Sequence, residues 1–97
     1  MGVLTSTSPA TGAHVRSWRT HTPEQIEQAL QDAHDAFTSW RTSAWPQRGA
    51  LLEAVADQMT SRREHLAALM TDEMGKPVTE ALAEVDKCAW KIGRAHV

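Results

Sequence analysis

The single cysteine, Cys88, is the residue of this 97-residue chain best suited to act as a nucleophile. A reactive thiolate needs a neighbouring cation or a helix N-terminus. Lys87 is adjacent in sequence, but on a helix its side chain points about 100° away from that of Cys88. Cys88 instead shares an apolar stripe with Ala81, Val85 and Ile92. Because a free cysteine in such a position behaves as a small hydrophobe, we predict a buried structural cysteine.

The histidines could bind a metal ion only if several of them converged with other ligands. They are His14, His21, His34, His65 and His96. No two stand four residues apart on a predicted helix, and no cysteine pair accompanies them. Since a zinc site needs three or four convergent ligands, the spacing favours surface histidines and predicts no metal site. A metal-binding helical protein is one of three hypotheses for the function of this chain, and the other two follow below.

Lys76 stands beside a glycine in "EMGKP", a juxtaposition that also occurs in phosphate-binding loops. A P-loop, however, requires G-x-x-x-x-G-K-[ST] after a strand. Here one glycine precedes the lysine, a proline follows it, and a helix leads in. The segment therefore predicts a turn.

Three carboxylates, Glu80, Glu84 and Asp86, lie along the last predicted helix. Glu80 and Glu84 share a face, and Glu84 is placed to pair with Lys87 or Lys91. An acid–base pair is the functional alternative. Alternating charges of this kind are more typical of a solvated helix face, which we predict.

Four tryptophans are unusually many for a chain of this length: Trp18, Trp40, Trp45 and Trp90. Trp40 falls on a predicted core stripe, and Trp45 is placed to act as a staple against the following helix. Stacking on a sugar or a base is the alternative, but large aromatic side chains more often serve packing. The residues therefore give no catalytic constellation, and we predict no catalytic, cofactor-binding or metal-binding residue within the chain.

Composition limits the classes of partner. The chain is 41% apolar and 23% charged, with a formal net charge of -2. It has no run of basic residues and no aromatic platform of the kind that RNA-binding proteins use, which argues against nucleic acid. Its apolar runs are far shorter than a membrane span, and its N-terminus does not resemble a secretory signal. One cysteine fits a reducing, cytoplasmic setting.

The first twenty residues predict a β-hairpin. In "SPATG", Pro9 and Gly12 have the spacing of a tight turn, because proline fixes one φ and glycine is free to take a positive φ. The segment "HVRSW" after it predicts a short strand. A lone hairpin is marginal in water, so this one needs another element to lie against.

Residues 22–91 predict three or four amphipathic helices. Thr22 and Gln25 form a capping-box pattern at the start of the first. Its apolar positions recur at helical spacing: Ile26, Leu30, Ala33, Phe37 and Trp40. Pro46 can open the second helix. A second capping-box pattern, Ser61 with Glu64, predicts a break near residues 60–63.

Gly75 has the position of a residue that ends a helix, and Pro77 prevents the helix from continuing. The last helix is expected to start at about Pro77. Each helix has one apolar face, and the chain contains no large sheet that could cover them all.

Taken in order, five segments resemble the N-terminal part of an NAD(P)-dependent aldehyde dehydrogenase. They are "SPATG", "AHDAFTSWR", "QRGALLEAVADQM", "REHLAALMTDEMGKP" and "EALAEVDKCAW". Together they cover residues 8 to about 90. The combination of "EMGKP" with "AEVDKCAW" looks most like the succinate-semialdehyde dehydrogenase branch of the family.

The resemblance implies an α/β parent with a Rossmann-type cofactor domain. Such a parent is a homo-oligomer that oxidises an aldehyde to an acid with NAD or NADP. The family's catalytic and cofactor-binding groups would all lie beyond residue 97, so the chain itself would be inactive and bind neither cofactor. Cys88 does not match the family's catalytic cysteine. Some members hold a structural monovalent cation, for which Thr7 and Glu84 are the nearest positions, and neither is predicted as a site.

The resemblance ends at Trp90, and residues 92–97 correspond to what a common sequencing-adapter stretch encodes in one frame. We therefore expect residues 1–97 to be the N-terminal part of an aldehyde dehydrogenase domain with an adapter-derived tail at 92–97. A naturally divergent end is the alternative. The competing functional hypothesis is a free-standing helical interaction module.

Overall fold

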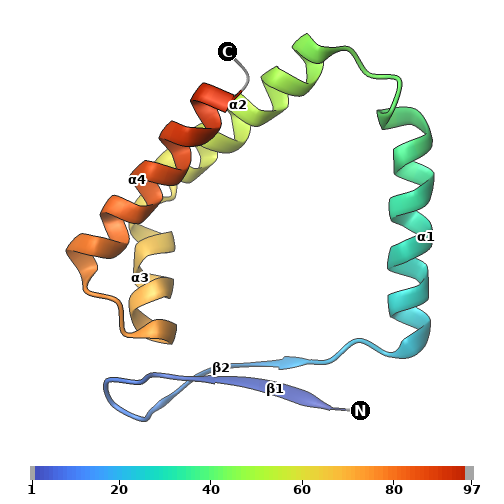
Figure 1. Cartoon of the computed structure of the whole chain (residues 1–97). Coiled ribbons are helices and arrows are strands. Elements are labelled where there is room, and N and C mark those ends of the chain that lie inside the picture. Colours follow the sequence, from blue (N-terminus) through green and yellow to red (C-terminus); the bar gives the residue numbers. More distant parts are fainter. Residues whose placement is uncertain (1, 96–97) are drawn as a thin grey trace.

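The computed structural model describes residues 2–95, so the last two residues of the expected tail, His96 and Val97, lie outside the described residues. A two-stranded sheet is followed by four helices (Figure 1), as the sequence predicts. The elements are β1 (Val3–Thr7), β2 (His14–Arg19), α1 (Pro23–Trp40), α2 (Trp45–Ser61), α3 (Arg63–Met74) and α4 (Val78–Ala95). Helix α4 thus runs on through residues 92–95.

The hairpin pairs β1 with β2 in antiparallel register, with Leu4 opposite Trp18. The turn between them closes where the Gly12 N–H donates to the Ser8 carbonyl over 2.8 Å. Gly12 has a φ of 75°, a conformation that glycine adopts without the steric cost other residues incur. The predicted turn in "SPATG" is therefore confirmed.

Helix α1 begins with the predicted capping box. The Gln25 N–H donates to Thr22 Oγ1 over 3.1 Å, and the Thr22 N–H donates to Gln25 Oε1 over 2.8 Å. These two bonds satisfy backbone donors that a helix start otherwise leaves without partners. Helices α1 and α4 are strongly amphipathic, with their apolar residues on one side, whereas α2 and α3 are only weakly amphipathic.

The predicted break near residues 60–63 is present, but its cause is not the predicted capping box. Arg62, with φ -104° and ψ 17°, separates α2 from α3, and no side chain caps the start of α3. The Ser61 hydroxyl instead donates backwards to the Gln58 carbonyl over 3.1 Å. The serine therefore supports the end of α2 rather than the start of the next helix.

Gly75 ends α3 in the left-handed conformation, with φ 73°, as the sequence predicts. A Cβ at this position would lie 3.0 Å from Pro9 Cγ in the hairpin turn. Glycine here lets the end of α3 lie close to the hairpin.

Replacing Gly75 with alanine is expected to lower the free energy of unfolding by about 1–2 kcal/mol, because a Cβ is strained at positive φ. Urea unfolding of both chains, followed by circular dichroism, measures this change. Gly12→Ala is the matched control, because its φ is 75° and its added Cβ meets nothing within 4 Å. Equal losses for the two variants would show that the contact with Pro9 contributes nothing.

The core lies where α3 packs on α4, and it is small. Ala67, Ala81 and Val85 are buried, and no large side chain among the described residues is fully buried. The residues packed around these three are Met59, Leu66, Met70 and Leu82. Two alanines at this contact let the helix axes approach closely, but they bury little apolar area.

The molecule is a thin slab of 48 × 37 × 15 Å. Its radius of gyration is 17.5 Å, whereas a compact domain of this length has about 13 Å. Helices α2, α3 and α4 pack together, while α1 stands apart from them across an open space (Figure 1). None of the helices in the described part of the chain is both long and apolar enough to span a membrane.

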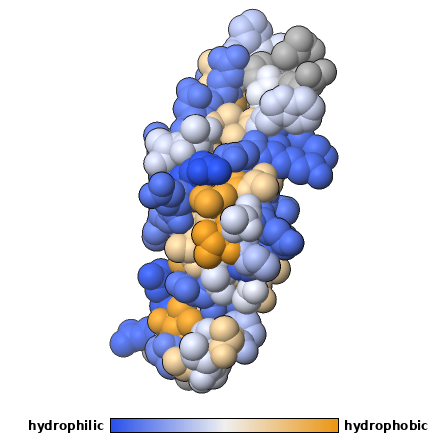
Figure 2. All heavy atoms as spheres, turned by 90° about the vertical axis from the view of Figure 1, so that its left-hand side faces the viewer, coloured by the Kyte–Doolittle hydropathy of each residue, from blue (hydrophilic) through white to orange (hydrophobic). Residues whose placement is uncertain are grey.

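Apolar side chains are exposed throughout the slab. On the side formed by α3 and α4 they reach the surface in patches bordered by hydrophilic residues (Figure 2). The exposed large apolar residues also include Val3, Leu4, Trp18, Ile26, Leu30, Phe37, Trp40, Leu51, Leu52 and Val55. The expected apolar faces are therefore present on α1 and α4, whereas α2 and α3 are less amphipathic than predicted. Most of the large apolar side chains are uncovered.

Candidate functional site

Residues capable of chemistry are scattered over the slab. Within residues 2–95 no group of three or more His, Cys, Asp or Glu side chains is placed to hold a metal ion. The four described histidines are exposed, and His14 Nε2 lies 2.6 Å from the Ser17 hydroxyl on the same strand. Thr7 is exposed at the end of β1.

Cys88 is exposed, so the prediction of a buried cysteine is wrong. It does lie near the stripe of Ala81 and Val85. The covered face of α4, however, is centred toward the side of Val85 and Ala89, which places Cys88 at its edge. Nothing in the described chain packs over that edge.

The exposed thiol of Cys88 is expected to react with a thiol reagent such as DTNB as fast in the native chain as in urea. An accessible cysteine needs no opening of the fold before it reacts. Stopped-flow absorbance measures the two rates. A native rate slower by about tenfold or more would mean that Cys88 is covered in solution and would contradict this prediction.

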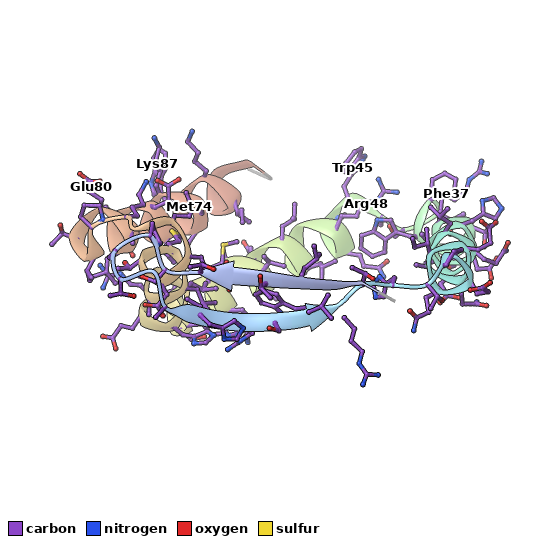
Figure 3. The ribbon with its side chains drawn as sticks, turned by 90° about the horizontal axis from the view of Figure 1, so that it is seen from below. Phe37, Trp45, Arg48, Met74, Glu80 and Lys87 are labelled. Carbon is purple, nitrogen blue, oxygen red and sulfur yellow. The ribbon has the colours of Figure 1, made fainter. Side chains whose placement is uncertain are left out.

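The carboxylates of α4 form ion pairs that differ from those predicted. Lys76 lies in the short connection before α4, and its Nζ is 3.4 Å from Glu84 Oε2. Glu84 therefore pairs with Lys76 rather than with Lys87 or Lys91. Glu80 and Lys87 project on the same side of the slab (Figure 3), beside this pair. These are solvated charges on a helix face.

Arg63 and Asp86 form a forked ion pair between α3 and α4. Arg63 Nε is 2.6 Å from Asp86 Oδ1, and Nη2 is 3.0 Å from Oδ2. The hydrogen bond to Asp86 raises the pKa of the Arg63 guanidinium. The stabilisation linked to this shift is therefore fully present below the unfolded pKa and is lost only at strongly alkaline pH. Sequence reasoning missed the pair, since its members are 23 residues apart.

Arg48 organises the connection between α1 and α2, residues 41–44, which we call the elbow. Its Nε donates to the Ser43 hydroxyl over 2.8 Å, and its Nη2 donates to the carbonyls of Trp40 and Arg41, each over 3.2 Å. The guanidinium carbon also lies 5.8 Å from the centre of the Trp40 ring and 5.1 Å from that of Trp45. No motif or spacing in the sequence pointed to Arg48.

Two predictions about the tryptophans at the elbow are wrong. Trp45 is 81% exposed and is the first residue of α2, so it does not pack as a staple against the helix that follows α1. Trp40 lies on the predicted stripe but remains exposed, because no element covers α1. Both rings lie beside Arg48, and Trp45, Arg48 and Phe37 project on the same side of the slab (Figure 3).

A hollow with acidic lining residues lies between α2 and α4 and has a volume of about 470 Å³. Glu53, Asp57 and Asp86 line it, together with Trp90. Asp86 is already paired with Arg63, and the lining contains no lysine or arginine that could bind a phosphate, while Glu53 and Asp57 add negative charge. The hollow therefore does not fit the pyrophosphate of a dinucleotide. The N-terminus of α1, which could attract an anion, is occupied by its own capping box.

A second hollow, of about 390 Å³, runs along α2 and α3, and we call it the α2–α3 groove. It is lined mainly by apolar groups, from Leu51, Ala54, Val55, Gln58, Met59, Arg62 and Leu66. Together with the uncovered face of α1, it makes the described surface suitable for packing against polypeptide.

Comparison with known proteins identifies the family. The model of the aldehyde dehydrogenase family matches residues 2–95. A probable NADP(+)-dependent succinate-semialdehyde dehydrogenase from Synechocystis is 41% identical over 86 residues, which are 89% of this chain and 19% of that protein. An N-succinylglutamate 5-semialdehyde dehydrogenase from Legionella pneumophila is 34% identical over 90 residues, 93% of this chain and 18% of that protein.

Solved structures agree with the sequence match. The NADP-dependent glyceraldehyde-3-phosphate dehydrogenase of Bacillus halodurans, solved with NADP, superposes with a TM-score of 0.92 at 29% identity, over 98% of this chain and 20% of that one. An NAD-dependent aldehyde dehydrogenase from Sinorhizobium meliloti superposes with a TM-score of 0.90 at 28% identity, over the same shares of the two chains. The chain thus spans about a fifth of the length of the relatives it matches. The sequence match and the superposition both show that this chain belongs to the aldehyde dehydrogenase family.

Proposed function

We propose that this chain corresponds to the N-terminal portion of an enzyme that oxidises succinate semialdehyde to the acid with NADP+. The observation that carries the proposal is the match over residues 2–95 combined with a share of about a fifth of each relative. Relatives named as succinate-semialdehyde dehydrogenases that use NADP+ support the choice of substrate and cofactor.

The 97-residue chain on its own is inactive in this proposal. Aldehyde oxidation through a thioester needs an activated thiolate, a base for water and a site that holds the nicotinamide. Cys88 lies on an exposed helix edge, and the acidic hollow does not suit a phosphate-bearing cofactor. In the whole enzyme the chain's role is structural, because its helices help to frame the rest of the domain.

The remaining properties of the whole enzyme are part of the same proposal. It would carry a Rossmann-type cofactor domain, assemble as a homo-oligomer and work in the cytoplasm without nucleic acid or membrane as partners. The TM-scores of 0.92 and 0.90 support the shared fold. Residues 92–97 remain predicted as an adapter-derived tail.

A chimera tests the proposal directly. Residues 2–90 of this chain would replace the matching segment of the Synechocystis relative. We expect the chimera to reduce NADP+ with succinate semialdehyde, because the framing helices are equivalent in the two proteins. Absorbance at the NADPH band measures turnover. A chimera that folds and binds NADP+ but does not turn over would contradict the proposal.

A second experiment assays the isolated chain. We expect no NADP+ reduction by the 97 residues alone, with succinate semialdehyde or with other short aldehydes. The control is the intact Synechocystis relative under identical conditions. Turnover by the isolated chain that survives Cys88→Ser would show that it contains a catalytic site elsewhere, and turnover lost in that variant would make Cys88 the nucleophile.

A further inference from the structure

Helix α1 presents an apolar face that no other described element covers. Ile26, Leu30, Phe37 and Trp40 recur along one side of the helix and are between 40% and 62% exposed. The helix stands apart from α2, α3 and α4 (Figure 1). An exposed apolar stripe of this extent marks a surface that binds another polypeptide.

The position of α1 is set by the elbow rather than by packing against the other helices. Arg48 ties two carbonyls and a hydroxyl at the end of α1 and in the elbow to the first turn of α2. These bonds fix the direction in which α1 leaves α2. The chain therefore presents the α1 face without first having to rearrange.

The relatives hold the same open arrangement within a much longer polypeptide. The Bacillus halodurans enzyme superposes on 98% of this chain with a TM-score of 0.92, but this chain covers only 20% of that enzyme. The Sinorhizobium meliloti enzyme gives a TM-score of 0.90 over the same shares. The place of α1, apart from the other helices, thus belongs to the fold that the longer chains share. The remaining four fifths of such a chain are the candidate occupant of the uncovered faces.

A second copy of the chain is a poorer occupant, because its charges do not match. Helix α1 carries four carboxylates and no lysine or arginine. Residues 45–74, which form the α2–α3 groove, carry five carboxylates against three arginines. The α1 helix of one copy would therefore meet a groove of the same sign of charge in another.

The uncovered area is large enough to hold two polypeptides together. The accessible surface is 7642 Å², whereas a compact protein of 10.7 kDa exposes about 5,500 Å². The excess of about 2,100 Å² is above the roughly 800 Å² that each partner buries in an interface of standard size. Complexes of standard size form without a peptide bond between the partners.

We propose that the α1 face and the α2–α3 groove bind the remaining four fifths of an aldehyde dehydrogenase as a separate polypeptide, so that the two pieces stay together without a peptide bond between them. The elbow favours this association, because a surface already in its bound conformation loses little free energy to ordering. The inference rests on the proposed function, which supplies the longer protein.

Cutting the chimera tests the inference. A site for a sequence-specific protease would be placed in the chimera of residues 2–90 with the Synechocystis relative, directly after the helix that corresponds to α4. Turnover before cleavage reports on the proposed function. After cleavage, we expect the two pieces to co-elute from a sizing column at about 1 μM and to keep turnover within about twofold.

Substitutions locate the contact. Leu30→Ala on the α1 face and Val55→Ala in the groove should each raise the dissociation constant of the cleaved pieces by about tenfold, since each removes an apolar group from the interface. Gln28→Ala is the matched control. Its side chain lies on the opposite side of α1 from Leu30 and donates to Asp32 over 2.8 Å. Circular dichroism of the uncut variants checks that each one folds.

A second form of the experiment needs no inserted site. The 97-residue chain and the relative without its matching segment would be unfolded together in urea and refolded by dilution. We expect turnover to return in proportion to the amount of the 97-residue chain. This form decides the matter if the inserted site itself stops turnover.

The outcomes separate this inference from the proposed function. A chimera that turns over when intact, but whose pieces separate and lose activity after cleavage, would overturn the inference alone. So would equal dissociation constants for Leu30→Ala, Val55→Ala and Gln28→Ala, or a discrete dimer of the 97-residue chain that excludes the relative's piece. A chimera that is inactive before cleavage contradicts the proposed function, and co-elution of its cleaved pieces still decides whether they associate.

Discussion

Replacing Val85 with aspartate is expected to abolish the packing of α4 on α3 and α2. Val85 is buried, and it shares the small core with Ala67 and Ala81. A carboxylate placed there would lie among the apolar side chains of Met59, Leu66, Met70 and Leu82, and a buried charge in such surroundings costs about 3 kcal/mol or more. Since small domains have only about 5–15 kcal/mol of stability, the variant should lose most of its cooperative structure.

Urea unfolding monitored by circular dichroism measures the effect of Val85→Asp. Ala83→Asp is the control, because it adds the same side chain to the exposed side of the same helix, two residues away. We expect the control to remain within about 0.5 kcal/mol of the original chain. If both variants unfold at the same urea concentration, the α3–α4 contact is not the core of the protein in solution.

Replacing Arg48 with methionine is expected to free α1 from its fixed direction. The change removes three hydrogen bonds and the cation that lies over Trp40 and Trp45. On a half-buried side chain these contacts together contribute about 1–3 kcal/mol to the ordered elbow. Because methionine fills a similar volume, any effect of the substitution comes more from the lost polar contacts than from lost packing.

The distance distribution between α1 and α2 measures this release. Spin labels at Gln31 and Ala50, in a Cys88→Ser chain diluted with unlabelled chain, should give a narrow distribution that broadens with Arg48→Met. Arg41→Met is the control, because Arg41 also lies over an aromatic ring, Phe37, at 5.7 Å, but its side chain makes none of the bonds that tie the elbow to α2. An unchanged distribution in the Arg48 variant would mean that α1 is oriented by other contacts.

The local features of the fold could be predicted because each depends on residues close in sequence. The capping box of Thr22 and Gln25 is three residues wide, and the left-handed end of α3 at Gly75 follows from one glycine before a proline. The turn closed by Gly12 has the same origin. In each case the chain satisfies its own backbone groups without help from distant residues.

The wrong predictions share a different cause, because they required knowledge of which faces would be covered. Helical spacing predicts that Cys88 packs in an apolar stripe, and Trp45 is predicted to act as a staple, but both side chains are exposed. Glu84 has several lysines within reach along the sequence, and the three-dimensional path of the connection selects Lys76. Periodicity shows which side of a helix is apolar, but it does not show whether anything lies against that side.

Arg48 and the pair of Arg63 with Asp86 could not have been found from the sequence. Arg48 acts through backbone carbonyls, and any arginine near a helix start has the same local appearance. The ion pair joins residues of two helices whose register is set by the alanines between them. The family resemblance, in contrast, was visible because five short segments keep their order along the chain.

The thinness of the slab has a consequence for how fast backbone amides exchange with solvent deuterium. At 15 Å, the molecule is little more than one helix thick, so almost every amide is within a side chain's length of water. The helix amides of a single chain would then be protected from exchange only by their own hydrogen bonds, except in the stretch of α4 that packs against Ala67. The slowest deuterium uptake should therefore be found between Ala81 and Val85, with fast uptake along α1 unless a partner covers it.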